Sequence, residues 1–171
     1  MQIAPLLHVG RGVTAIIGGG GKTTLMETLA GELSKKGKVI ITTTTHICRP
    51  KQYETLLDAD EAAVSAALER SGIVCAASQA ESGKLCAPRL SMGTLAQLAD
   101  FVLVEADGAK RLPLKAHAAH EPVIPPEANQ TILVVGASGF GRPMRESVHR
   151  APIAAQALGV SEETVVTPEL W

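Results

Sequence analysis

The sequence predicts a three-layer α/β fold, in which helices cover both faces of a mainly parallel β-sheet. Short apolar runs, typical of strands buried on both faces, recur along the chain and alternate with segments of helical periodicity. Several of these runs end in glycine, hydroxyl-bearing or acidic residues, and there are no internal repeats or long linkers. At 171 residues the chain is expected to form a single domain, residues 1–171.

Composition and charge argue against several classes of partner. The chain has 16 basic and 17 acidic residues and a formal net charge of −1, so we expect neither nucleic acid nor a membrane surface as partner. Aromatic residues make up only 2%, which removes the stacking platforms of single-strand binders. There is no signal-peptide pattern and no apolar run of membrane-spanning length. Together with an odd count of three cysteines, these features predict a cytoplasmic protein without a disulfide framework.

A glycine-rich segment after the first apolar run is typical of a phosphate-binding loop. The run 13–17 predicts a central strand, and it is followed by Gly18, Gly19, Gly20, Gly21, Lys22, Thr23 and Thr24. Glycine amides can approach an anion closely because no Cβ blocks them. The lysine offers a charge for phosphate oxygens, the first threonine offers a hydroxyl to Mg²⁺, and a helix that begins there points its positive end at the anion. We therefore expect a P-loop NTPase-like domain that binds ATP or GTP with Mg²⁺.

The loop departs from the standard pattern in one position. G-x-x-x-x-G-K-[ST] requires glycine six residues before the lysine, where this chain has Ile16. The shorter form G-x-x-G-K-T-T resembles the compact loop of the Mur ligases, which also bind ATP. A dinucleotide-binding fingerprint fails because Thr23 stands where its last glycine should be. A simple glycine-rich turn is the alternative, but it gives no reason for the lysine and the two threonines.

The next strand ends in a run of threonines. Helical spacing of Leu25, Leu29 and Leu33 predicts a helix that stops before Gly37, and residues 39–45 then predict a strand. Ligands of an open parallel sheet bind at the carboxyl ends of its strands, so we expect hydroxyls of this run to face the glycine loop. The nucleotide-binding candidates are Thr43 and Thr44, with His46 within reach of the same crevice. Threonine is also a good strand former, so a purely structural role remains open.

An apolar run that ends in acids resembles a Walker-B strand. Residues 101–104 are apolar and lead into Glu105, Asp107 and Gly108. A carboxylate at the end of such a strand holds Mg²⁺ or its water shell near the phosphates, so Glu105 and Asp107 are the candidate metal ligands together with Thr23. The alternative is a strand that simply ends in an Asp-Gly turn.

Positive and metal-binding side chains follow these acids directly. Lys110, Arg111 and Lys115 are able to clamp phosphates, although exposed loop lysines are ordinary. The candidate catalytic residues are therefore Lys22, Glu105, Asp107 and Lys110, with Arg111 as an alternative to Lys110. His117, His120 and Glu121 form a weaker candidate metal set, since no helix aligns them.

Other elements follow from local signals. Residues 60–70 and a segment capped by Ser91 predict helices, residues 73–76 and 84–87 predict a hairpin that brings Cys75 near Cys86, and residues 131–135 predict a third buried strand. This cysteine pair lacks the further ligands of a metal site. A helix is expected at 151–159, and residues 165–171 carry the start signals of a helix that the chain has no length to complete, which indicates a shortened form.

The motifs GGGGKTT, TTTTHI, VEADGAKRLPLKAH, HEPVIP and VHR occur in this order, and with them the chain resembles the YqeC family over most of its length. The resemblance implies a P-loop-like accessory protein in the maturation of a selenium-dependent molybdenum hydroxylase, acting on its cofactor or delivering selenium or sulfur. The family's loop falls on residues 18–24, its threonine run on 42–46 and its acidic strand end on Glu105, Asp107 and Gly108. It also implies a further C-terminal part with an N-K-x-D-like element. Because that element is absent from this sequence, ATP and GTP remain equal candidates.

Three functions fit these expectations. The first is Mg²⁺-dependent nucleotide hydrolysis or group transfer, in which Lys110 or Arg111 stabilises the developing charge. The second is a non-catalytic, nucleotide-gated chaperone or scaffold for the hydroxylase. The third is binding of a phosphate-bearing molybdenum cofactor alone. No residue stands out in the sequence as the base for an attacking group.

Overall fold

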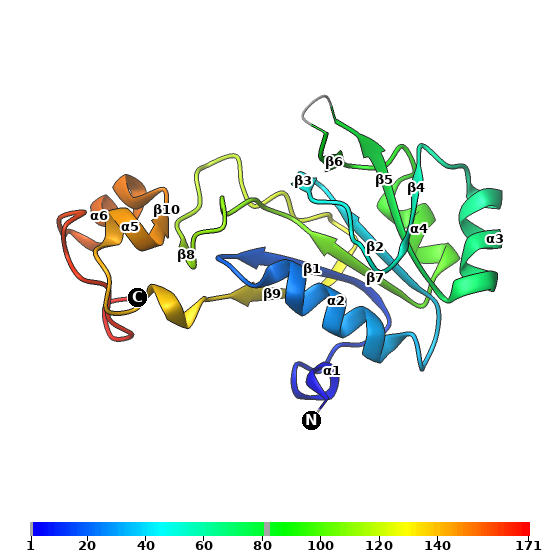
Figure 1. Ribbon diagram of the computed structural model, residues 1–171, viewed down its shortest axis with the longest axis horizontal. Coiled ribbons are helices and arrows are strands. Elements are labelled where there is room, and N and C mark those ends of the chain that lie inside the picture. The colour runs from blue at the N-terminus through cyan, green and yellow to red at the C-terminus, as the bar shows by residue number, and fades with distance from the viewer. Residues whose placement is uncertain (1, 81–82) are drawn as a thin grey trace.

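The computed structural model describes residues 2–80 and 83–171 and has an α/β fold around a mainly parallel sheet (Figure 1). Within these residues the parallel strands lie side by side in the order β4, β5, β2, β7, β1, β9. Their bounds are Glu54–Leu57, Ile73–Gln79, Val39–Thr43, Phe101–Glu105, Gly12–Gly18 and Ala128–Val134, respectively. Because these strands are parallel, the residues that follow β1, β2 and β7 meet at one edge of the sheet.

Helices cover both faces of this sheet, as expected for three layers. The helices α1 (Ile3–Leu6) and α2 (Lys22–Leu33) pack on one face, and α3 (Glu61–Ser71) and α4 (Met92–Leu98) pack on the other. Alternate residues of each strand enter the two cores, so that in β2 Ile41 joins the first core and Ile40 the second. None of the described helices has the length and apolarity needed to cross a membrane.

The helix boundaries follow from their capping residues. The Asp60 carboxylate accepts the Ala63 N–H at the start of α3, and the Ser91 hydroxyl accepts the Thr94 N–H at the start of α4. In contrast, α2 begins after Gly21, which has no side chain to cap the helix. The first amides of α2 are therefore left for another acceptor.

The strand predicted at residues 131–135 forms, but it is not buried. It belongs to β9, which among the described strands pairs only with β1 and so forms an edge of the sheet. Leu133 is 59% exposed and belongs to neither core, whereas its neighbour Ile132 is buried in the first one. An apolar run signals low polarity on both faces of a strand, but the sequence does not say which strand lacks a second neighbour.

Smaller differences from the predicted fold concern the strands β3 to β6. The strand predicted at residues 39–45 ends at Thr43, so Thr44 and Thr45 lie in a bend before the short β3 (His46–Ile47). The strand β4 was not expected. The predicted hairpin forms between β5 and β6 (Leu85–Cys86), with residues 81–82 outside the described part. Its register places Cys86 opposite Ser78, so Cys75 is not its partner. Burial raises the pKa of the Cys75 thiol to about 12.

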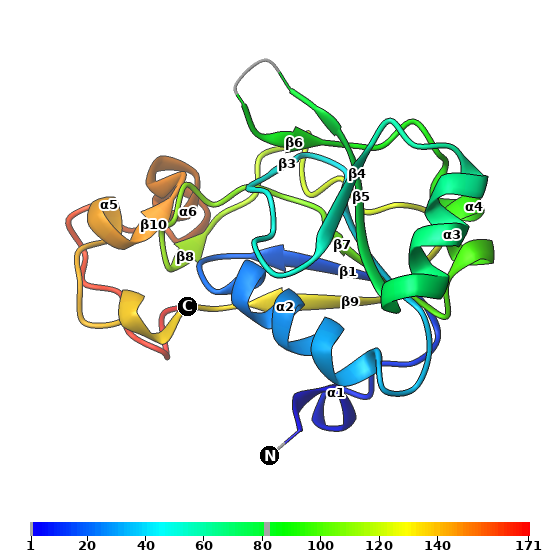
Figure 2. The same ribbon diagram turned by 45° about the vertical axis from the view of Figure 1, so that its right-hand side comes forward.

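The C-terminal part forms a third, smaller core beside the carboxyl edge of the sheet. It holds a two-stranded sheet of β8 (Leu114–Lys115) and β10 (Val148–His149), the short helix η1 (Ala137–Gly139), and the helices α5 (Met144–Ser147) and α6 (Ala151–Leu158). Figures 1 and 2 show this part at the end of the molecule away from α3 and α4. At the chain end, Thr167 caps a single turn, and no helix forms from the start signals.

Candidate functional site

The glycine loop, residues 18–21, joins β1 to α2 and packs tightly against residues 112–114. Gly18 and Gly21 have φ angles of +104° and +103°, in the left-handed region that favours glycine. A Cβ on Gly19 would lie 1.8 Å from the carbonyl oxygen of Pro113. Backbone conformation and close packing therefore require glycine at these three positions.

The backbone amides of the loop fall into two groups. The N–H groups of Gly18, Gly19 and Gly20 donate to Asp107 Oδ2 (2.9 Å), Val134 O (2.8 Å) and Pro113 O (3.2 Å). The amides of residues 21–24 have no acceptor within the described part of the chain. The donors open to a ligand are therefore those at the start of α2, where the helix dipole is also positive.

Lys22, the first residue of α2, bends back over the loop. Its Nζ donates to the carbonyl oxygens of Gly18 (2.7 Å) and Gly19 (3.3 Å) and lies 3.0 Å from Asp107 Oδ1. The side chain is 4% exposed. In this structure Lys22, expected to contact phosphate oxygens, is thus paired with Asp107, two residues beyond the end of β7.

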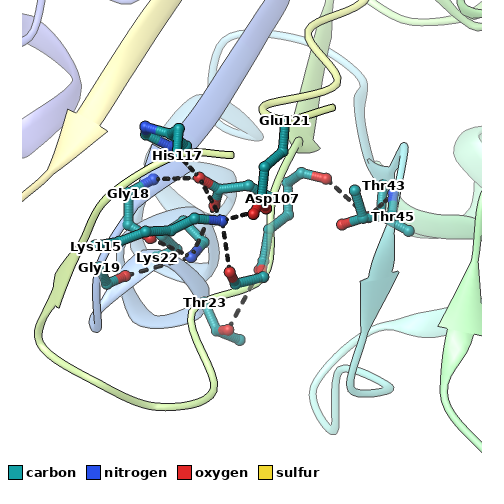
Figure 3. A network of polar contacts seen from close by, with 12 residues as sticks. Gly18, Gly19, Lys22, Thr23, Thr43, Thr45, Asp107, Lys115, His117 and Glu121 are labelled. Carbon is teal, nitrogen blue, oxygen red and sulfur yellow. Dashed lines mark hydrogen bonds and ion pairs between the residues drawn. The ribbon is translucent and has the colours of Figure 1, made fainter. Parts of the chain in front are cut away.

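Asp107 is the centre of this charge network, as Figure 3 shows. Its side chain is fully buried, and its Oδ2 also lies 2.7 Å from His117 Nε2 and 3.3 Å from Lys115 Nζ. Burial alone would raise the pKa of Asp107, but the Gly18 amide, the charge of Lys22 and the hydrogen bond with His117 together hold the pKa below its usual value. Asp107 is therefore an ionised anchor for the loop and does not line the cavity described next.

Glu105 points to the other side, into a cavity of about 380 Å³ that we call the loop cavity. Its carboxylate Oε2 lies 3.4 Å from the Thr23 hydroxyl, which donates to it. Burial raises the pKa of Glu105 to about 7, and the charge of Lys22 offsets this only in part. The loop cavity is lined by residues 19–24, 46–48, 84, 105 and 108–111.

The high pKa of Glu105 predicts a pH dependence of stability. Between pH 4.5 and 7 the folded protein keeps a proton that the unfolded chain has released, so the free energy of unfolding falls as pH rises through this window, by up to about 3 kcal/mol. We expect Glu105→Gln to remove this slope and to stabilise the protein above pH 7. Urea denaturation at pH 5 and pH 8 measures it, with the exposed Glu127→Gln as control; equal slopes for Glu105→Gln and the parent protein would contradict the assignment.

Of the other residues predicted for the site, some line the loop cavity and some do not. His46, Lys110 and Arg111 line it, and the last two adopt left-handed backbone conformations with φ of 48° and 64°. Thr43 and Thr44 do not line it; their hydroxyls donate to the carbonyl oxygens of Glu105 (2.7 Å) and Val123 (2.6 Å). In this structure those two threonines hold backbone segments together.

Three charged side chains extend the network toward the C-terminal part, and the sequence did not predict that they pair with one another. Lys115 Nζ, fully buried, contacts Glu121 Oε2 (2.5 Å) and Gly108 O (2.6 Å), and Glu121 also accepts from Arg150 at the start of α6. Glu121 and His117, considered above as metal ligands, thus have different partners. Among the described residues no group of three or more histidine, cysteine or acidic side chains is placed to hold a metal ion.

The fold and the site together define an α/β protein in which a glycine loop, a helix N-terminus and an acidic strand end meet at the carboxyl edge of a parallel sheet. The protein-family model described as "YqeC protein" matches residues 14–152, so the chain belongs to the YqeC family. This match confirms the resemblance that the motifs predicted. It is 34% identical over 163 residues to a protein of Escherichia coli (strain K12) named "Uncharacterized protein YqeC". That match covers 90% of this chain and 63% of the relative, so the chain spans about 63% of the relative's length. No solved structure matches the chain.

Proposed function

We propose that the loop cavity binds a Mg²⁺–nucleoside triphosphate, as in P-loop NTPases. The observation that carries this proposal is the set of amides at residues 21–24, which have no acceptor in the described structure and open onto a cavity that Glu105 and Thr23 also line. Free amides at a helix N-terminus match the charge and size of phosphate oxygens. The paired carboxyl and hydroxyl oxygens match the oxygen ligands that Mg²⁺ requires.

In this proposal each side chain has a distinct task. Thr23 and the ionised form of Glu105 hold Mg²⁺, and Lys22 keeps the loop in shape and adds positive potential beneath the phosphates. Lys110 and Arg111 also line the loop cavity, and in this proposal they contact the terminal phosphate and stabilise charge that develops there. Because Mg²⁺ binds the carboxylate and not the carboxylic acid, nucleotide affinity rises with pH through about 7.

The proposed biological role is that of a cytoplasmic accessory protein in the maturation of a selenium-dependent molybdenum hydroxylase. Its support is the family resemblance carried by the five ordered motifs. Both ATP and GTP fit the proposal, since it uses only phosphate contacts.

A thermal-shift panel of ATP and GTP, with and without Mg²⁺, tests binding. A nucleotide at a hundredfold excess over Kd stabilises the folded state by about 2.7 kcal/mol, which corresponds to roughly 5–10 °C in Tm for a chain of this size. We expect this shift only with Mg²⁺, its loss in Lys22→Ala, and its reduction in Thr23→Ala, whose exposed side chain is removed without disturbing the core. The exposed Lys36→Ala is the matched control. Absence of a shift with both nucleotides would overturn the proposal.

A non-catalytic, nucleotide-gated scaffold is a second candidate, and the charge network favours it. The contacts from Lys22 through Asp107, Lys115 and Glu121 to Arg150 connect the glycine loop to the start of α6, so a nucleotide that moves Lys22 also changes this chain of ion pairs. Phosphate release measured on nucleotide-saturated protein separates the two functions. Turnover above that of Thr23→Ala supports hydrolysis, and saturable binding without turnover supports the scaffold.

A further inference from the structure

A second cavity, of about 350 Å³, lies beside the glycine loop and shares no lining residue with the loop cavity. We call it the far cavity. Gly19, which lines the loop cavity, packs closely against Pro113, the residue before Leu114 in the wall of the far cavity. The lining residues that matter here are Ile17, Gly18, Leu114, His117, Leu133 and Trp171.

The walls of the far cavity are mainly apolar. Leu133 and Val135 line it and are 59% and 39% exposed. The cavity therefore lies along the exposed end of the edge strand β9 and the residue that follows it. Exposed aliphatic side chains beside a cavity of this size suit a small molecule with an apolar body. They do not suit an anion, because the ammonium group of Lys115 on the same wall is already paired with Asp107 and Glu121.

His117 supplies the polar group of this cavity. Its Nε2 lies 2.7 Å from Asp107 Oδ2, and the ring is 26% exposed. A carboxylate only accepts hydrogen bonds, so in the neutral ring the proton resides on Nε2 and the lone pair on Nδ1. Asp107 therefore fixes the tautomer in which Nδ1 is an acceptor.

We infer that the far cavity is a binding site for a small, mainly apolar molecule that carries a hydroxyl or thiol group, which donates its hydrogen bond to His117 Nδ1. The ligand's apolar body contacts Leu133, Leu114 and Trp171. The same Asp107 that orients His117 accepts from the Gly18 amide and pairs with Lys22, so this site adjoins the glycine loop through a shared residue. The site does not depend on the proposed nucleotide binding.

The test is an NMR titration of the full chain with p-cresol, and with 4-methylanisole as the matched probe whose hydroxyl is methylated. No nucleotide is added, so the result does not depend on whether the loop cavity binds nucleotide. We expect p-cresol to shift the Leu133 methyl, Trp171 indole and His117 imidazole resonances and to bind about tenfold more tightly than 4-methylanisole, the effect of one hydrogen bond.

Two variants with matched controls complete the test. His117→Phe should abolish the difference between the two probes, whereas His120→Phe, a change at the nearby exposed histidine, should leave it intact. Leu133→Glu should weaken both probes, whereas Leu158→Glu on α6 should weaken neither. The inference is overturned if millimolar p-cresol leaves the far-cavity resonances unmoved, or if the two probes bind the parent protein equally well.

Discussion

Replacement of Asp107 by alanine is expected to lower the free energy of unfolding by roughly 3–5 kcal/mol, the usual cost of removing one partner from a buried ion pair. The side chain is fully buried and contacts Lys22, Lys115, His117 and the Gly18 amide. Its loss leaves two buried ammonium groups with less compensation and a loop amide without an acceptor. For a chain of this size the change corresponds to a fall in Tm of about 10 °C.

Urea denaturation at pH 7 measures this effect, and Asp107→Asn separates its causes. The asparagine keeps a hydrogen-bond acceptor for Gly18 but removes the charge. The free energy of unfolding of this variant should therefore lie between those of the parent protein and the alanine variant. Glu69→Ala, which breaks the exposed pair with Lys38, is the control and should cost less than about 1 kcal/mol. An alanine variant of Asp107 as stable as the control would show that the network does not hold the loop.

The second large effect is expected at Gly19, where a single methyl group cannot be accommodated. In Gly19→Ala the new Cβ would overlap the Pro113 carbonyl, whose oxygen also accepts from the Gly20 and Gly136 amides. Relief requires the loop to move away from residues 112–114, at a cost of about 1–3 kcal/mol. Nucleotide affinity should fall at least tenfold, because the amides of residues 21–24 move with the loop.

Gly10→Ala is the control for this substitution. A Cβ at Gly10 has no neighbour within 4 Å, and its φ lies outside the left-handed region, so its stability should change by less than about 0.5 kcal/mol. Far-UV circular dichroism, urea denaturation and nucleotide titration on both variants give the comparison. If Gly19→Ala binds nucleotide as tightly as Gly10→Ala, the packing of the loop on Pro113 is not required for the site.

Much of the framework was predictable because its signals are local. The strand–glycine–helix order at residues 13–33 and the acids at the end of β7 are contiguous patterns, and parallel pairing then brings Glu105 beside Thr23. Which acid faces the cavity was not predictable. Glu105 and Asp107 are two residues apart, but the chain leaves β7 between them, so strand alternation no longer decides their directions.

The rest of the network could not be predicted because it depends on long-range contacts. Lys115, Glu121 and Arg150 are each ordinary charged residues in irregular or terminal positions, and only the folded C-terminal part brings them together. The edge position of β9 has the same origin, since an apolar sequence does not reveal how many neighbours a strand has. The motif VEADGAKRLPLKAH did contain a usable signal: a second lysine and a histidine follow the acids at short spacing.

Nucleotide binding at the start of α2 is tested most directly by following the backbone amide resonances of residues 21–24 by NMR during titration with Mg²⁺–ATP and Mg²⁺–GTP. We predict that these amides shift strongly and saturably with at least one nucleotide, while the Gly18 and Gly19 amides, which already donate to Asp107 and Val134, shift much less. If the amides of residues 21–24 stay unmoved at millimolar concentrations of both nucleotides, the glycine loop is not a phosphate-binding site.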